Sequence, residues 1–221
     1  MQKFDTPDPI SAVVDVPAGR VQFIAADRAD TTVDVRPVDA SSSRDVKAAE
    51  QTKADSGNGV LRIEGPAKTR VLGSPGYVEV TVQLPAGSRV DAKSASAEFR
   101  TVGRLGDVAF DGSQASVKID EAASARLSVL DGDVSVGRLG GDADIRTRRG
   151  SIQVAEAVRG TVALTTEDGS ITVDAAAGAS ASLDAGTTLG RIHNALRNTE
   201  GTPGLNIRAT TARGDITARS L

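Results

Sequence analysis

Apolar and polar residues alternate in short segments along much of the chain, and a glycine separates the segments of each pair. The sequence DGDVSV at 131–136 is repeated as RGSIQV at 149–154 and DGSITV at 168–173, with looser copies at 189–194 and 213–218. Alternate positions on both sides of the glycine are aliphatic, and Ser, Thr, Asp, Arg and Gln lie between them. This period of two predicts β-strands with one buried side, because a helix would need apolar residues three and four positions apart.

The turn glycines recur at a nearly regular interval. They are separated by 18, 19, 21 and 24 residues and are Gly132, Gly150, Gly169, Gly190 and Gly214. A second series of segments, which we interpret as corners, begins every 16–19 residues at 103–107, 121–124, 137–141, 156–160, 175–178 and 193–201. Two independent markers with one period indicate a structural repeat of strand, tight turn, strand and corner.

One repeat buries too little apolar surface to offset the entropy lost when its backbone becomes ordered. Each repeat therefore needs neighbours on both sides, which is the arrangement of a solenoid. The sequence predicts an all-β fold, a β-solenoid resembling a single-stranded β-helix, with rungs of about 18–19 residues over 88–221. Val134, Ile152 and Ile171 are expected in adjacent layers of one interior column, about 4.8 Å apart.

Charged residues beside the turns support this register. The position before the turn glycine carries, in sequence order, Asp131, Arg149, Asp168, Leu189 and Arg213. Opposite charges thus lie in neighbouring rungs, as cross-strand pairing favours. Exposed pairs of this kind contribute only about 0–1 kcal/mol each, so they indicate register rather than stability.

The first 87 residues follow the pattern less regularly. Segments 13–25 and 80–92 share a strand, a Pro-Ala-Gly hairpin and a second strand, while 31–38 and 59–65 predict two further strands. Residues 39–59 form a polar insertion with room for one or two helical turns after a serine cap, and 65–76 is expected to be a loop. Because no linker separates independent domains, residues 1–221 are predicted to form a single β-solenoid domain with irregular N-terminal strands at 1–87.

Composition narrows the possible functions. The 221 residues carry a net charge of −3, with no Cys, no Trp, one Tyr and four Phe. A nucleic-acid partner is not expected, because such binding normally uses a basic surface with stacking aromatic side chains. The N-terminus lacks the apolar core of a signal peptide, and no segment approaches the roughly 18 apolar residues of a membrane span. We therefore expect a cytoplasmic protein.

The residues that could carry chemistry have simpler structural explanations. His193, the one histidine, is expected on the surface, whereas a general base would need an orienting acid. Asp131 and Asp133 flank Gly132, but aspartate is a common turn residue and this segment lacks the full set of oxygen ligands that calcium takes. The GRLGG segment at 137–141 lacks the Gly-Lys-Ser/Thr ending of a phosphate-binding loop. We predict no catalytic, cofactor-binding or metal site.

A β-helix glycoside hydrolase is the enzyme class that such an architecture could support. Its chemistry needs two carboxylates roughly 5–10 Å apart. The stack could supply them from Asp142, Asp144, Glu167, Asp168 and Asp184. Sugar-binding grooves usually present aromatic side chains, however, and the repeat region contains only Phe99 and Phe110. The sequence therefore favours a protein that is not an enzyme.

The repeated Gly-[Asp/Ser]-[Ile/Val]-x-Val turns, the VPAG and LPAG hairpins, and the VGRLGD and VGRLGG corners are shared with a known group. They resemble the bacterial β-strand-repeat proteins of unknown function that are often labelled "putative adhesin". The resemblance covers essentially the whole chain. It implies a β-helix-like stack and no established enzymatic activity, and it supplies no catalytic motif.

The sequence thus predicts a non-enzymatic structural or protein-interaction scaffold that binds another protein or a second copy of itself. The last repeat, 205–218, is followed by no capping segment. It is expected to be an open edge through which copies associate end to end. The alternatives are an adhesin or glycan-binding module and, less favoured, a β-helix-type carbohydrate-active enzyme.

Overall fold

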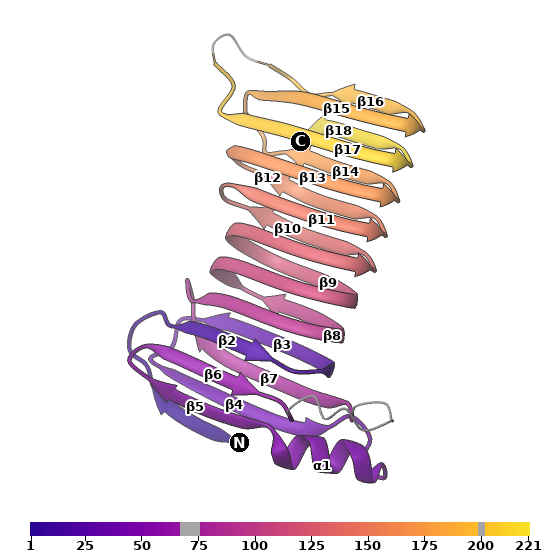
Figure 1. Ribbon diagram of the computed structural model, residues 1–221. Helices are drawn as coiled ribbons and strands as arrows, with labels where there is room; N and C mark the ends of the chain where they lie inside the picture. Colours follow the sequence, from indigo (N-terminus) through magenta and orange to yellow (C-terminus); the bar gives the residue numbers. More distant parts are fainter. Residues whose placement is uncertain (67–75, 199–201) are drawn as a thin grey trace. The chain divides into compact units, whose positions relative to one another are not determined.

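The computed structural model of the protein describes residues 1–66, 76–198 and 202–221 (Figure 1). Most of the loop expected at 65–76 and the end of the corner expected at 193–201 lie outside these residues. The elements are β1 (Gln2–Asp5), β2 (Ser11–Asp15), β3 (Ala18–Ala26), β4 (Asp30–Pro37), α1 (Ser43–Gln51), β5 (Lys53–Gly57), β6 (Val60–Glu64), β7 (Val78–Pro85), β8 (Arg89–Val102), β9 (Arg104–Asp131), β10 (Val134–Leu139), β11 (Ala143–Arg149), β12 (Ile152–Ala157), β13 (Gly160–Asp168), β14 (Ile171–Ala175), β15 (Ala181–Leu189), β16 (Ile192–Ala195), β17 (Leu205–Arg213) and β18 (Ile216–Ser220). The predicted all-β, solenoid-like class is confirmed.

The chain divides into two compact units, Met1–Ala115 and Ser116–Leu221, and β9 contributes residues to both. This division falls inside the region predicted to consist of regular rungs. That all 221 residues act as one domain stays a prediction.

Parallel strands of the second unit stack in the predicted register. Val134 of β10 pairs with Ile152 of β12, and Ile152 pairs with Ile171 of β14. All three side chains are at most 1% exposed, so they form the expected interior column. Their positions in the sequence differ by 18 and 19 residues. On the other side of each turn, β11 pairs in parallel with β9 and β13.

The last rung in the sequence is not the last layer of the stack. β18 pairs with β14 on one side and β16 on the other, and β17 lies likewise between β13 and β15 (Figure 1). Residues 205–220 therefore lie between the rung of β13 and β14 and the rung of β15 and β16. The prediction that 205–218 forms the open edge is wrong. The outermost layer of this unit is β15 and β16, which we call the open rung.

A buried ion pair favours the inserted position of the last rung. The Asp174 side chain on β14 is buried, and its carboxylate accepts two hydrogen bonds from the Arg219 guanidinium, at 2.8 and 2.7 Å. The same bonds raise the pKa of Arg219 above its ordinary value. In the strand register, Arg219 lies opposite Ala195 of β16 on its other side. If β16 lay directly on β14, an alanine would face this carboxylate and leave it buried without a cation, which is strongly destabilising.

The first unit also places its first rung inside its stack. β2 pairs in parallel with β6 and β8, and β3 pairs in parallel with β7 and β8. Residues 11–26 therefore lie between strands that follow them in the sequence. Since β2 and β3 both run parallel to β8, the Pro-Ala-Gly segment at 17–19 is a corner and not the hairpin that the sequence suggested. The segment at 85–87 is also not a hairpin, because β7 pairs with β3 while residues 89–93, at the start of β8, pair with β2.

The outer layer of the first unit is covered. β4 pairs antiparallel with β7, β5 with β6, and β1 with β4. The helix α1, which begins after the N-cap Ser42, contacts β4 and β7. The polar insertion at 39–59 thus contains the helix for which the sequence had room. In the core of the first unit, Phe23, Phe99 and Phe110 are buried in a row, with successive ring centroids 6.0 and 4.7 Å apart.

The turns explain why glycine recurs in every rung of the second unit. A Cβ atom on Gly169 would lie 2.0 Å from the carbonyl oxygen of Gly150 in the layer beside it, which is far too close for any side chain. The same carbonyl accepts a hydrogen bond from the Thr166 hydroxyl at 3.0 Å. Three other threonines at the equivalent position donate in the same way to the turn glycine of the adjacent rung: Thr147 to Gly132, Thr211 to Gly169 and Thr187 to Gly214.

Candidate interaction surfaces

Two of the five carboxylates considered for catalysis, Asp142 and Asp168, link neighbouring layers. Asp142 Oδ1 accepts a hydrogen bond from the Thr161 backbone N–H at 2.7 Å, and Asp168 pairs with Arg213 at 3.0 Å. Asp144 binds Arg146 on its own strand through both carboxylate oxygens. Glu167 and Asp184 are exposed. The structure therefore gives three of the five carboxylates a defined structural partner.

The turn aspartates and the histidine also occupy structural positions. Asp131 pairs with Arg149 at 2.9 Å, and Asp133 Oδ1 accepts a hydrogen bond from the Ser151 N–H at 2.7 Å. His193 is exposed on β16, as expected. Within residues 1–66, 76–198 and 202–221, no group of three or more His, Cys, Asp or Glu side chains is arranged to hold a metal ion.

A column of alternating charge follows one rim of the second unit. In the order of the layers it reads Asp131, Arg149, Asp168, Arg213 and Leu189. The prediction of alternating charges is confirmed, and the alternation is more regular in space than in the sequence, because Arg213 precedes Leu189. The column changes from charged to apolar only at the open rung.

The open rung exposes an isoleucine of the interior column and a leucine of the charged column. Ile192 is 46% exposed, whereas Ile171 and Ile216 in the same column are 0% exposed. Leu189, beside the turn, is 65% exposed. Among the described strands, β15 pairs with β17 and β16 with β18, and no strand lies on their other side (Figure 1). The result is an edge with exposed apolar side chains and backbone groups that another strand could bind.

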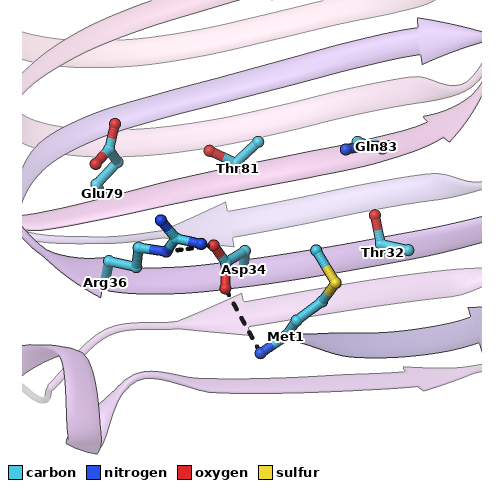
Figure 2. Close-up of a pocket in the computed structure, with 7 residues that line it drawn as sticks. All are labelled: Met1, Thr32, Asp34, Arg36, Glu79, Thr81 and Gln83. Atoms are coloured by element: carbon cyan, nitrogen blue, oxygen red, sulfur yellow. Dashed lines mark ion pairs between the residues drawn. The ribbon is translucent and has the colours of Figure 1, made fainter.

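A second candidate surface is a polar hollow on β4 and β7 of the first unit. Figure 2 shows Asp34 beside Arg36, with a nitrogen–oxygen distance of 2.6 Å, and Met1 approaching Asp34. Pairing of the two strands places Thr81 opposite Asp34, Glu79 opposite Arg36 and Gln83 opposite Thr32. The hollow is lined by Met1, Thr32, Asp34, Arg36, Glu79, Thr81 and Gln83. It presents positively and negatively charged side chains together with neutral hydrogen-bonding groups, and none of these lining side chains is aromatic.

Arg28 and Lys3 form an ionic cluster around Asp30 at the start of β4. Arg28 Nε and Lys3 Nζ lie 2.8 and 3.0 Å from the Asp30 carboxylate, and Arg28 also binds Gln83. Hydrogen bonds from Arg28 and then Lys3 lower the pKa of Asp30 to about 2. Asp30 is therefore ionised at neutral pH and helps to fix β4 beside the hollow.

Neither surface was found from the sequence. The polar hollow depends on antiparallel pairing between β4 and β7, and no local pattern specifies that pairing. The open rung did leave a signal, because Leu189 interrupts an otherwise charged column. If Arg213 is placed opposite Asp168, the charges in the column alternate again, and residues 181–195 form the outermost rung.

The comparisons agree with this architecture. The model of the Toastrack DUF4097 family matches residues 11–219. The chain belongs to this family. The resemblance to bacterial β-strand-repeat proteins of unknown function is thereby confirmed. A comparison with the curated proteins gives no match.

Solved structures similar to this Toastrack chain include a "putative adhesin" from Bacteroides fragilis. It is 12% identical, with a TM-score of 0.60, and the match covers 98% of this chain and 95% of the other. A "putative adhesin" from Parabacteroides distasonis has 16% identity, a TM-score of 0.44 and the same two coverages. At these identities the likeness to the first structure shows the fold alone. In the part of the Toastrack chain that is described, no helix is both long and apolar enough to cross a membrane.

Proposed function

We propose that this Toastrack chain is a non-enzymatic protein-interaction scaffold. In this proposal it is a β-solenoid with rungs of about 18–19 residues, and its open rung binds a strand of a protein partner. The offsets of 18 and 19 residues along the column Val134, Ile152 and Ile171 support the solenoid. The observation that carries the proposal is the exposure of Ile192 in a column whose other members are buried.

Backbone geometry supports the choice of a strand as the ligand. In the inner layers, the turn N–H groups donate to the next rung: Gly150 to Asp168 at 2.9 Å, Gly169 to Arg213 at 2.8 Å and Gly214 to Leu189 at 2.9 Å. Gly190 lies in the turn of the open rung, and no rung among the described residues lies beyond it. An added strand could continue both the backbone ladder and the interior column, which is the usual mode of strand addition to a sheet edge.

Site-specific photo-crosslinking tests this proposal in cells. A photoreactive residue replaces either His193 on the open rung or Gln153, which faces outward from the inner strand β12. We expect protein adducts at position 193 and few at position 153, and mass spectrometry identifies the adduct. An absence of protein adducts at position 193, or equal yields at both positions, would overturn the proposal.

A glycan-binding or adhesin function is the second candidate, and the polar hollow is the observation that favours it. Thr81→Leu would fill the hollow with an apolar side chain, and Thr172→Leu on the outer side of β14 is the control. Glycan-array binding that Thr81→Leu abolishes and Thr172→Leu retains would support this candidate. Binding by neither the wild type nor the control would remove it.

Location separates the two candidates. The cytoplasmic location expected from the sequence is not supported by the comparisons and stays a prediction of the scaffold proposal. An adhesin must reach the cell surface. Cell fractionation with detection of the full chain distinguishes these outcomes, because recovery with the surface fraction contradicts the cytoplasmic prediction.

A further inference from the structure

The open rung departs from the usual composition of an edge. Natural edge strands are protected by lysine, proline, bulges or inward-pointing charges. β15 and β16 contain no Lys or Pro, and Asp184 is their one Asp, Glu, Lys or Arg residue. Leu189 stands opposite Arg213, where an aspartate would continue the alternating column. The apolar residue at this position indicates that an apolar side chain covers it when the edge is occupied.

We propose that the occupant is a second copy of this chain, bound through the same rung across a two-fold axis. This inference rests on the proposed function, because it names the partner of the open rung. β15 and β16 run in opposite directions from one turn. A two-fold axis parallel to the strands lays β15 of each copy antiparallel on β16 of the other. Such an isologous contact closes on itself and forms a dimer.

The alternation of side chains restricts the register of this pairing. Inward residues must meet inward residues, since a shift by one position would turn every side chain to the other face. One permitted register places Leu189 opposite Ile192 of the second copy. The symmetry repeats this contact, so the four large apolar side chains exposed on the two open rungs meet in pairs.

The same register also matches the polar residues. Counting along antiparallel strands from Leu189 and Ile192, Thr187 meets Asn194 of the second copy. The Thr187 hydroxyl donates to the Gly214 carbonyl at 3.1 Å and keeps acceptor capacity for the Asn194 amide. Arg197 lies two residues beyond the end of β16, and continuing the count by three positions brings Asp184 near it. Both side chains are exposed, and the dimer contains this pair of opposite charges twice. Apolar, hydrogen-bonding and charged positions therefore agree on one register.

Sedimentation equilibrium of the full chain over a wide concentration range tests the dimer. The wild type is expected to dimerise, and Leu189→Asp is expected to weaken the dimer at least about tenfold, which corresponds to about 1.4 kcal/mol. The variant restores the charged column beside Arg213, so its thermal unfolding should show an intact fold. Leu130→Asp is the matched control, because Leu130 is also exposed, at 51%, but lies on the inner strand β9.

Charge reversal tests the register. Asp184→Arg and Arg197→Asp should each weaken the dimer, and the double variant should return its Kd to near the wild-type value. A wild type that stays monomeric at all concentrations, or a dimer insensitive to Leu189→Asp, overturns the inference. Single reversals without recovery in the double variant overturn the register. Crosslinking of position 193 to a different protein, with a monomeric wild type, would overturn this inference and leave the scaffold proposal standing.

Discussion

Each unit of the chain places one rung out of sequence order, and the two units treat their outermost layers differently. In the first unit, β2 and β3 lie between strands that follow them, and in the second, β17 and β18 lie between strands that precede them. The first unit then covers its outer layer with β1, β4, β5 and α1. The second leaves β15 and β16 uncovered and replaces a charge with Leu189.

This difference teaches that a rung can have the same repeat pattern whether it is an interior layer or an edge. The distinction lies in a few positions where charge or apolar surface faces the next layer. The two units can therefore be compared by substituting equivalent residues in an inner layer and in the open rung, and by loosening the cover of the first unit.

The largest loss of stability is expected from Gly169→Ala, in a turn of an inner layer. Its Cβ would lie 2.0 Å from the Gly150 carbonyl oxygen, with layers on both sides. We expect a loss of about 4 kcal/mol or more in the free energy of unfolding, the range of severe backbone and packing defects. Gly178→Ala is the control, since its φ of 77° is also positive but nothing lies within 4 Å of its added Cβ. Urea denaturation showing equal losses for both variants would contradict the layered explanation.

The next largest loss of stability is expected in the interior column. Truncation in an inner layer should cost more than truncation at the open rung. Ile171→Ala should lower the free energy of unfolding by about 2–5 kcal/mol, because it leaves a cavity between fully buried neighbours. Ile192→Ala should cost less than about 1.5 kcal/mol, because its side chain is 46% exposed. Both are measured by urea denaturation in the Leu189→Asp background, so that association does not contribute. Similar losses would mean that residue 192 is covered in the monomer.

Loosening the cover of the first unit should have an intermediate effect. Asp45 on α1 is buried and accepts hydrogen bonds from the Tyr77 N–H at 3.1 Å and the Asp39 N–H at 3.2 Å. Asp45→Ala leaves these donors without their acceptor and should cost about 1–3 kcal/mol. Exposed Lys47→Ala, on the same helix, should change stability by less than about 0.5 kcal/mol. Hydrogen exchange of β4 amides should accelerate only in Asp45→Ala, and unchanged exchange would show that α1 does not hold the cover.

The smallest effect concerns the acid sensitivity of the first unit. The pKa of Asp30 falls from 3.8 to about 2 in the folded protein, because Arg28 and Lys3 bind the ionised carboxylate. The stabilisation is therefore complete above the unfolded pKa and is lost as the pH falls through 3.8 toward about 2. Asp30→Asn should melt below the wild type near neutral pH, and the difference in Tm should shrink as the pH falls through 3.8 and disappear below about pH 2. A difference that persists there would assign the effect to packing instead.

Much of the second unit could be predicted because its interior column repeats one residue type in one local pattern. The same uniformity concealed the order of the rungs, because Gly190 and Ile192 resemble Gly214 and Ile216 in type and spacing. Pairing Ile171 with Ile216 rather than with a nearer rung lengthens the closed loop from about 20 residues to 45, which costs only about 0.7 kcal/mol of loop-closure entropy. Long-range pairs such as Arg219 with Asp174 favour the observed order instead.

The first unit was harder to predict, because its cover comes from antiparallel strands that no repeat anticipates. The sequence predicted a serine cap within the insertion without identifying it, and that cap is Ser42. Nothing in residues 53–57 distinguished β5 from a loop. The polar hollow was missed for the same reason, since Asp34 and Thr81 are 47 positions apart and meet only when β4 pairs with β7.

The inserted rung of the second unit also sets an order of events during translation. Residues 181–195 leave the ribosome before residues 205–220, on which they will rest. Until the later segment emerges, Asp174 has no guanidinium beside it and the earlier segment lacks its final neighbour. The nascent chain must therefore hold a gap open or release a temporary pairing, and the second unit can close only when its last strands have been synthesised.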